Sequence, residues 1–178
     1  AVRIASDLPL GVNVLRNDAV SALAVAHAAG AQFIRVNVLT GARVTDQGII
    51  EGRAHELMRR RVLVDAEHIA VWADVDVKHS AALAPQPIEQ EVHDLLDRGG
   101  ANALIVSGAG TGRPTDIAHL EHVKQAAVTR PVHVGSGVTR TNIADLLDVA
   151  DGVIVGTALK VDGIVTNSAW YPFDLGRR

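Results

Sequence analysis

Charged and aliphatic residues alternate along one short segment of the sequence. The aliphatic and polar sets are, in order, Val71, Ala73, Val75, Val77 and Trp72, Asp74, Asp76, Lys78. Because successive side chains of a strand point to opposite faces of its sheet, the two carboxylates and the ammonium are predicted to share one face. Burying ionised groups without partners costs several kcal/mol each, so such a row requires mutual pairing, a metal ion or a ligand.

Three uses of this row remain open from the sequence. Asp74, Asp76 and Lys78 could serve acid–base or electrostatic catalysis, in which a lysine beside two carboxylates tends to stay protonated. The two aspartates with Asn37 could hold a divalent cation such as Mg²⁺, which prefers oxygen ligands. A structural network of aspartates with lysine or arginine is the third use. His79 follows directly and could be a base, a ligand or a structural residue.

Polar residues also lie at the ends of other expected strands, where barrel enzymes place their chemistry. The candidates for binding and orienting a substrate are Asn13, Arg35, Asn37 and Ser107. We further expect residues 40–52 to form a loop that acts as a lid, with Asp46 and Glu51 reaching the site.

Two glycine-rich turns near the end of the chain predict a phosphate site. Gly135, Ser136 and Gly137 follow one expected strand, and Gly156 and Thr157 follow the next. Glycine lets backbone N–H groups approach an anion closely, and a helix opening just after the first turn would add a favourable dipole. Phosphate-binding barrels hold their ligand in the loops after their last two strands. Tight turns without a ligand are the alternative interpretation.

The elements that must position these residues alternate between β-branched runs and longer segments rich in alanine and leucine. We expect strands over Leu10–Leu15, Gln32–Leu39, Ile69–Lys78, Ala103–Ser107, Val132–Gly135 and Gly152–Gly156. We expect helices over Ala19–Ala29, Ile49–Val64, Pro87–Arg98, Thr115 or Asp116 to Val128, and Thr139–Val149. This alternation is typical of repeated βα units and a parallel sheet.

The number of units bears on the fold class. About six βα units fit, whereas a TIM (β/α)₈ barrel has eight and typically about 250 residues. The opening residues Ala1–Ala5 look like the tail of a helix. We therefore expect an α/β fold, a (β/α)₈ barrel whose first one or two βα units are missing from this chain, as a single domain over residues 1–178. An open doubly wound sheet is the alternative.

Composition excludes several classes of function. The 178 residues are 48% hydrophobic and 21% charged, as in an ordinary globular domain. A formal net charge of -3 gives no electrostatic footprint for nucleic acid, and no apolar run is long enough for membrane insertion. The chain has no cysteine, which excludes disulfides and thiol catalysis. A cytoplasmic setting is the expectation.

Contiguous blocks of the sequence resemble the BtpA/SgcQ family, which is named after a cyanobacterial photosystem I biogenesis protein. The blocks are Pro9–Asp18, Phe33–Gly41, Thr45–Gly52, Ala73–His79, Ala103–Gly108, Val134–Val138 and Ala150–Lys160. The resemblance covers nearly the whole chain and implies a (β/α)₈ barrel related to phosphate-binding barrels. One departure is Asn167–Pro172, where the family continues with an Asn-Pro turn into a last helix.

The family name does not assign an activity, because a role in photosystem assembly cannot be general in organisms without photosystems. We therefore expect an enzyme acting on a phosphorylated sugar or nucleotide-like small molecule, with the reaction unassigned. The alternative is a non-catalytic assembly or stability factor that uses the barrel as a binding scaffold, with neutralised interior charges and an exposed apolar patch. Self-association into a homo-oligomer is expected in either case.

Overall fold

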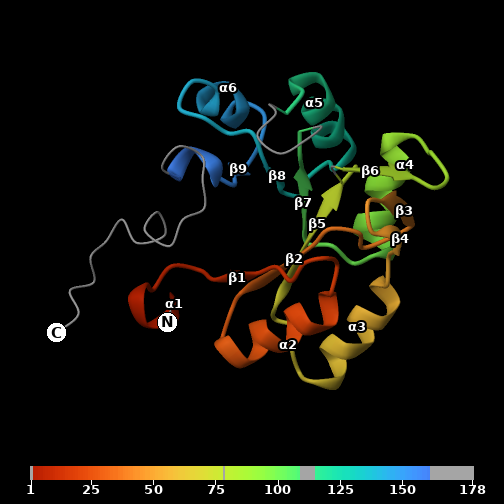
Figure 1. Ribbon diagram of the computed structural model, residues 1–178, viewed down its shortest axis with the longest axis vertical. Coiled ribbons are helices and arrows are strands. Elements are labelled where there is room, and N and C mark those ends of the chain that lie inside the picture. The colour runs from red at the N-terminus through yellow and green to blue at the C-terminus, as the bar shows by residue number, and fades with distance from the viewer. Residues whose placement is uncertain (1, 78, 109–114, 161–178) are drawn as a thin grey trace.

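The computed structural model describes residues 2–77, 79–108 and 115–160, and a parallel sheet runs through its centre (Figure 1). In spatial order its strands are β1 (Gly11–Val12), β2 (Phe33–Val36), β5 (Ala70–Val75), β7 (Ala103–Val106), β8 (Val132–Val134) and β9 (Gly152–Val153). Every neighbouring pair is parallel. The order increases steadily across the sheet, as in a barrel, whereas a doubly wound sheet reverses its order at a switch point.

Helices follow most of the central strands along the chain. They are α1 (Val2–Ala5), α2 (Ala19–Ala29), α3 (Ala54–Leu63), α4 (Ile88–His93) continued by the π-helical turn η1 (Asp94–Arg98), α5 (Ile117–Ala126), α6 (Ile143–Leu147) and the 3₁₀ turn η2 (Thr157–Leu159). The helix α2 spans the predicted residues because both of its ends are capped. Asp18 accepts a hydrogen bond from the Ser21 amide, and Gly30 ends the helix with φ 63°.

The core lies between the helices and the outer face of the sheet. Ile34, Val71, Leu104 and Val132 are each fully buried there, and the cluster around them is built from alanine, valine, leucine and isoleucine. These residues occupy the alternate strand positions that carry aliphatic side chains in the sequence, and these positions face the helices. Aliphatic burial against helices therefore fixes which side chains of each strand point to the opposite, inner face.

An aromatic stack lines part of the inner face. The rings of Phe33 and Trp72 stack with centroids 4.1 Å apart, and those of Trp72 and His133 with centroids 4.3 Å apart. Glycine is required at both ends of this stack. A Cβ atom on Gly11 would lie 2.1 Å from the Phe33 ring, and one on Gly152 would lie 2.7 Å from the His133 ring.

A second, antiparallel sheet replaces the start of a predicted helix. Its strands are β3 (Ala42–Thr45), β4 (Gly48–Glu51) and β6 (Ser80–Ala82), in the order β4-β3-β6. The predicted helix Ile49–Val64 is therefore wrong over its first turn, since Ile49 and Ile50 pair with β3 and α3 begins only at Ala54. Gly48, with φ 94°, allows the tight turn that returns the chain.

Other predicted elements are shorter than the sequence suggests. The strand predicted over Ile69–Lys78 ends at Val75, because Asp76 takes a positive φ of 46° and turns the chain out of the sheet. The helix predicted over Thr139–Val149 is reduced to Ile143–Leu147. The departure at Asn167–Pro172 lies outside the described residues.

Candidate functional site

Asp74 is the centre of a buried polar network on the inner face. Its side chain has no exposed surface, and its two oxygens accept hydrogen bonds from Arg35 Nε at 2.8 Å and Arg35 Nη2 at 2.9 Å. Asn37 Nδ2 donates a third hydrogen bond to Asp74 at 2.8 Å. The bidentate pair neutralises both charges and fixes the plane of the guanidinium. Asp74 therefore holds Arg35 and Asn37 in place.

The same network reaches the neighbouring strands on both sides. Asn13 Nδ2 donates to Asn37 Oδ1 and to the Arg35 carbonyl oxygen, which joins the β1 edge to β2. On the other side, Gly135 lies against it, since a Cβ atom there would be 3.2 Å from Arg35 Nη2 and 2.8 Å from Ser107 Oγ. Ser107 Oγ is buried and has no hydrogen-bond partner within the described residues.

The predicted row of inward charges does not form as expected. Asp76 follows the strand instead of belonging to it, and its carboxylate accepts a hydrogen bond from Arg43 Nη1 at 2.7 Å. Lys78 lies outside the described residues. His79 has φ 56° and leads into β6. Of this row, the described structure thus places only Asp74 in the inner network.

Ion pairs fasten the β3–β4–β6 sheet over one end of the central sheet. Buried Arg43 donates to Asp76 and, at 2.7 Å, to Glu91 of α4. Hydrogen bonds to Asp76 and the charge of Glu91 raise the pKa of Arg43, although burial alone would lower it. Arg16 pairs with Asp46 in the turn between β3 and β4. Residues 40–52 are thus a clamped hairpin, where the sequence predicts a loop.

Asn17 is a further clamp that the sequence does not reveal. Its side chain donates to the Val38 carbonyl and accepts from the Val38 amide, and it also lies 3.5 Å from the Glu51 carbonyl oxygen. Glu51 therefore contacts the β1 end through its backbone. Asn17 has a positive φ of 66°, a conformation that asparagine tolerates better than most residues.

A hollow of about 210 Å³ lies between this hairpin and the end of the central sheet, and we call it the hairpin hollow. Its apolar lining consists of Leu15, Val38, Ile50 and Val77, and its polar lining of Arg16, Asn17, Asn37, Thr45 and His79. Two predicted site residues, Asn37 and His79, therefore line the same hollow, and Asn37 also belongs to the Asp74 network.

A second hollow of about 330 Å³ lies at the ends of β8 and β9, and we call it the glycine hollow. Its lining includes all five predicted phosphate residues, Gly135, Ser136, Gly137, Gly156 and Thr157. The remaining lining residues are Val138, Thr139, Ile154, Ala158 and Lys160. The structure thus brings the two glycine turns together.

The lining of the glycine hollow is rich in unused main-chain donors. No hydrogen bond in the described part of the chain uses the amides of Ser136, Gly137, Val138, Gly156, Thr157 and Ala158. Gly137 has φ 71°, as in the turns whose successive N–H groups form anion-binding concavities. Lys160 is the one charged side chain among the described lining residues.

Two parts of the predicted phosphate site differ from expectation. The helix α6 has only five residues and begins at Ile143, so it adds little dipole to the hollow. The Thr139 amide is already used, since it donates to Asn142 Oδ1. The side chain of Ser136 ties two loops together, because its Oγ accepts the Gly108 amide at 3.1 Å.

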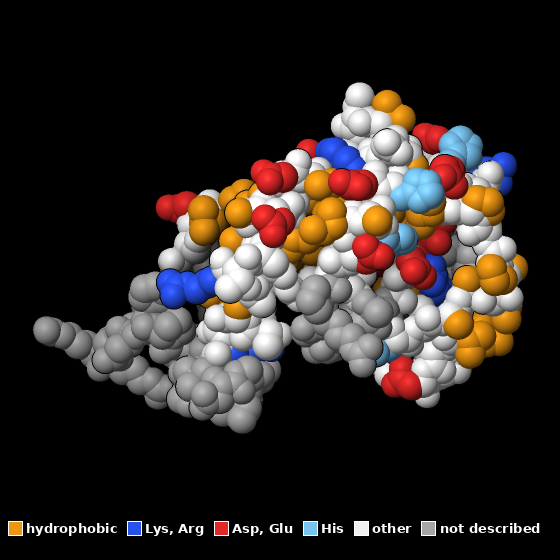
Figure 2. All heavy atoms as spheres, turned by 90° about the horizontal axis from the view of Figure 1, so that it is seen from above, with side chains coloured by type: hydrophobic (Ala, Val, Ile, Leu, Met, Phe, Trp, Pro, Cys, Tyr) orange, Lys and Arg blue, Asp and Glu red, His pale blue; other side chains and the backbone are white. Residues whose placement is uncertain are grey.

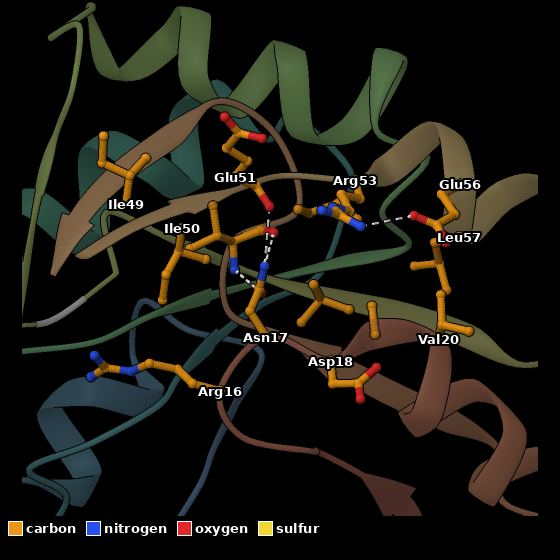
Figure 3. A pocket seen from close by; sticks show the side chains of 14 residues that line it. Arg16, Asn17, Asp18, Val20, Ile49, Ile50, Glu51, Arg53, Glu56 and Leu57 are labelled. Carbon is orange, nitrogen blue, oxygen red and sulfur yellow. Dashed lines mark hydrogen bonds and ion pairs between the residues drawn. The ribbon is translucent and has the colours of Figure 1, made fainter. Parts of the chain in front are cut away.

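A larger hollow of about 430 Å³ lies away from this network (Figure 3). It is lined by Val36 and Val38, whose parity is that of the helix-covered face, together with residues of α2, α3 and β4. Arg53 and Glu56 form an ion pair at its rim, and Asn17 reaches Glu51 across it (Figure 3). Its lining contains one predicted site residue, Glu51, but none of Arg35, Asn37 and Asp74, which lie in the inner network.

The described residues contain no group of three or more histidine, cysteine, aspartate or glutamate side chains arranged to hold a metal ion. Asp74 and Asp76 instead have separate arginine partners. None of the helices in residues 2–77, 79–108 and 115–160 combines the length and apolar character needed to cross a membrane.

Comparison with known proteins identifies relatives along most of the chain. A family model described as the BtpA family matches residues 1–170. The photosystem I biogenesis protein BtpA of Synechocystis sp. is 48% identical over 160 residues, which are 90% of this chain and 55% of that protein. The chain spans 55% to 62% of the length of this and two further curated relatives.

Solved structures with similar folds share little sequence with the chain. FabK (M276A mutant) of Thermotoga maritima has a TM-score of 0.58 at 18% identity, covering 90% of this chain and 48% of that one. The N-(5'-phosphoribosyl)anthranilate isomerase of Pyrococcus furiosus has a TM-score of 0.57 at 14% identity, covering 94% and 72%. These likenesses, with the six-stranded parallel sheet, confirm the TIM-barrel type of α/β fold.

Proposed function

This chain belongs to the BtpA family, and we propose that it binds the phosphate group of a phosphorylated small molecule in the glycine hollow. The ligand is a sugar phosphate or a nucleotide-like compound, and the protein acts on it as an enzyme. The phosphate site is the premise from which the other parts of the proposal follow.

One observation carries the proposal. Six of the residues that line the glycine hollow have amide N–H groups that no described residue accepts, and Lys160 is the one charged side chain in its described lining. Unpaired donors at a concave turn attract an anion, and a cationic side chain adds to that attraction. A carboxylate lining would oppose phosphate binding, but the described lining contains none.

Arg35 is the group that we expect to act on the bound molecule. Asp74 occupies its Nε and Nη2, whereas Nη1 makes no hydrogen bond within the described part of the chain. A guanidinium fixed in this way is preorganised to stabilise negative charge that develops on a substrate oxygen. Its position beside Gly135 puts it next to the proposed phosphate site.

Ligand-dependent thermal stabilisation of the natural full-length protein tests the phosphate site. The probes are inorganic phosphate, ribose 5-phosphate and adenosine 5'-monophosphate, each with and without Mg²⁺, and unphosphorylated ribose serves as the control. A ligand that binds the native state raises the melting temperature by an amount that grows with the logarithm of its concentration above the dissociation constant. We expect a shift with the phosphorylated probes alone, and equal melting temperatures throughout would refute the phosphate site.

The variant Gly156→Val locates the binding. A Cβ atom on Gly156 meets no atom within 4 Å, so the side chain of valine takes up space beside the hollow without a clash. We expect this variant to fold and to lose the phosphate-dependent shift. Gly135→Val is a poorer test, because its Cβ would lie 2.5 Å from Ile105 Cγ2 and would disturb the sheet itself.

A scaffold without catalysis is the second candidate, and two observations favour it. The interior charges Arg35 and Asp74 neutralise each other. Val44 and Ile49 on the β3–β4–β6 sheet, and Leu83 just after β6, are 44%, 60% and 57% exposed. Figure 2 shows hydrophobic side chains gathered at the end of the molecule where this sheet and α4 lie. The scaffold predicts that Val44→Asp abolishes capture of a protein partner while phosphate binding is unchanged.

A further inference from the structure

We propose that the ligand of this site is nucleotide-like: its phosphate lies in the glycine hollow and an apolar ring enters the hairpin hollow. This inference rests on the proposed function, because it takes the glycine hollow as the phosphate end. It goes further by choosing between a plain sugar phosphate, which would fill one hollow, and a longer phosphomonoester that uses both.

The linings of the two hollows differ in chemistry. The glycine hollow presents main-chain donors and Lys160, which suit an anion. The hairpin hollow presents Leu15, Val38, Ile50 and Val77, which suit an apolar group. Ligand pockets are typically apolar with a few polar groups that fix orientation, and the hairpin hollow matches that description with Asn37 at its inner side.

The arginines that the structure describes around the hairpin hollow are already paired. Arg16 pairs with Asp46, and Arg43 behind the hairpin pairs with Asp76 and Glu91. A second phosphate or carboxylate would therefore compete with existing ion pairs in this hollow. A neutral ring can enter without displacing a partner of these ion pairs. The volume of the hollow, about 210 Å³, corresponds to roughly seven waters at about 30 Å³ each.

Hydrogen bonds run from the hairpin hollow to Arg35, which lies beside the glycine hollow. Asn37 lines the hairpin hollow and donates to Asp74, Asp74 holds Arg35, and Arg35 Nη2 lies against Gly135 of the glycine hollow. Donors along this line, including Arg35 Nη1, fit the oxygens of a sugar placed between the two ends. The line thus matches the order phosphate, sugar and ring.

The separation of the hollows sets the length of the ligand. The hairpin hollow is lined by residues that follow β2 and β5, which are three and two strand spacings from β8, or about 10–14 Å along the sheet at about 4.8 Å each. At about 1.5 Å per bond this distance takes about seven to ten bonds, within the length from phosphorus through ribose to the far edge of a base. A ring-form pentose phosphate, with about six bonds from phosphorus to its far oxygen, is shorter than this.

Calorimetric titration of the natural full-length protein tests the inference with ribose 5-phosphate and adenosine 5'-monophosphate. We expect the nucleotide to bind about tenfold more tightly or better, because its ring leaves water for the apolar hollow. The variant Ile50→Trp fills the hairpin hollow and should remove this gain while ribose 5-phosphate binds as in the parent protein. Equal affinities of the parent protein for the two probes would overturn the inference but leave the phosphate site standing.

The neighbouring residue offers a matched control. Ile49 lies on the same strand as Ile50 but on the opposite face, and it is 60% exposed. It does not line the hairpin hollow. Both isoleucines line the hollow of about 430 Å³ on the outer face. Ile49→Trp should therefore keep the nucleotide gain, and its loss in both variants alike would count against the hairpin hollow. If Ile50→Trp fails to fold, Ile50→Ala decides, since loss of its apolar contact should weaken nucleotide binding alone. Binding of neither probe to the parent protein would overturn the proposed function as well.

Discussion

At the β1–β2–β5 half of the sheet's carboxyl edge, every arginine of the site has a carboxylate partner: Arg35 with Asp74, Arg43 with Asp76 and Glu91, and Arg16 with Asp46. At the β8–β9 half, the amides of the two glycine turns and the Lys160 ammonium have no such partners within the described residues. In one half of the edge the charged groups pair with one another, and in the other half hydrogen-bond donors are available to a ligand.

The difference indicates separate roles for the two halves, one in positioning side chains and one in binding a ligand. Paired charges gain little by exchanging one partner for another, so the first half positions groups and walls off a hollow. Unpaired donors gain a charge-assisted hydrogen bond when an anion binds, so we expect the proposed ligand to gain its affinity at the second half. Substitutions in the first half should therefore change mainly stability, and substitutions in the second should change mainly affinity.

The largest expected effect is the loss of the buried carboxylate. Asp74→Asn keeps the size of the side chain but leaves the Arg35 guanidinium without its counter-charge, and removing one partner of a buried pair costs about 3 kcal/mol or more. Urea unfolding of the variant measures this loss of the free energy of unfolding.

The double variant Arg35→Met with Asp74→Asn is the control, since it removes both charges together. We expect it to be more stable than Asp74→Asn alone, because no charge is then left unpaired. A double variant that loses the sum of the two single effects would mean that the pair is not coupled and that Asp74 does not hold Arg35.

The next effect is at the hairpin. Arg43 is buried and joins β3 to Asp76 and Glu91, so Arg43→Met should lower the free energy of unfolding by about 1.5–3 kcal/mol, a typical range for charge-assisted hydrogen bonds. Arg16→Met, which breaks the more exposed pair with Asp46, should cost under about 1 kcal/mol. Chemical denaturation of the two variants compares them, and equal losses would show that the hairpin is not fastened by Arg43.

The same contrast explains what the sequence could predict. The meeting of the two glycine turns was predictable, because glycine allows main-chain geometry that depends on few distant residues, and both turns line one hollow. Phosphate binding there stays a proposal. The inward parity of Arg35, Asn37 and Asp74 was equally predictable, because the alternation of strand side chains is local. The repetition of βα units predicted a parallel sheet but left a barrel and a doubly wound sheet open; the family resemblance implied the barrel, and the strand order supports it.

The hairpin was not predictable from the same signals. Ile49 and Ile50 extend a plausible helical pattern, and only their pairing with Val44 and Arg43 across the turn makes them a strand. Arg43 carried no signal because its partners Asp76 and Glu91 are distant in sequence. The alternation alone places Asp76 in the inner row, because nothing in the local sequence marks the end of β5 at Val75. In the structure, the positive φ of Asp76 ends the strand.

A smaller effect is expected at the open half. Lys160→Met removes the one charge in the described lining of the glycine hollow, so affinity for inorganic phosphate should fall about tenfold, equivalent to about 1.4 kcal/mol. Lys124→Met is the matched control, because this lysine pairs with Asp151 just before β9, at the opposite end of that strand. Titration at low and high salt measures both variants, and equal affinities would remove Lys160 from the site.

The smallest effect concerns acid stability at the end of β9 away from the glycine hollow. Asp151 accepts hydrogen bonds from Lys124 Nζ and from the Val132 amide, and these lower its pKa below the ordinary 3.8. A carboxyl whose pKa is depressed by folding contributes stability above pH 3.8 and loses that contribution as the pH falls from 3.8 through its folded pKa. Both partners are partly exposed, so solvent screening keeps the contribution under about 1 kcal/mol.

Asp151→Asn should therefore be slightly less stable than the parent protein at pH 6 and equal to it near the acid end of that window. If the difference in free energy of unfolding between the variant and the parent protein persists unchanged at the lowest pH, the carboxyl group stabilises the fold by packing alone. Its charge pair with Lys124, which has no counterpart among the described residues of the glycine turns, would then contribute nothing.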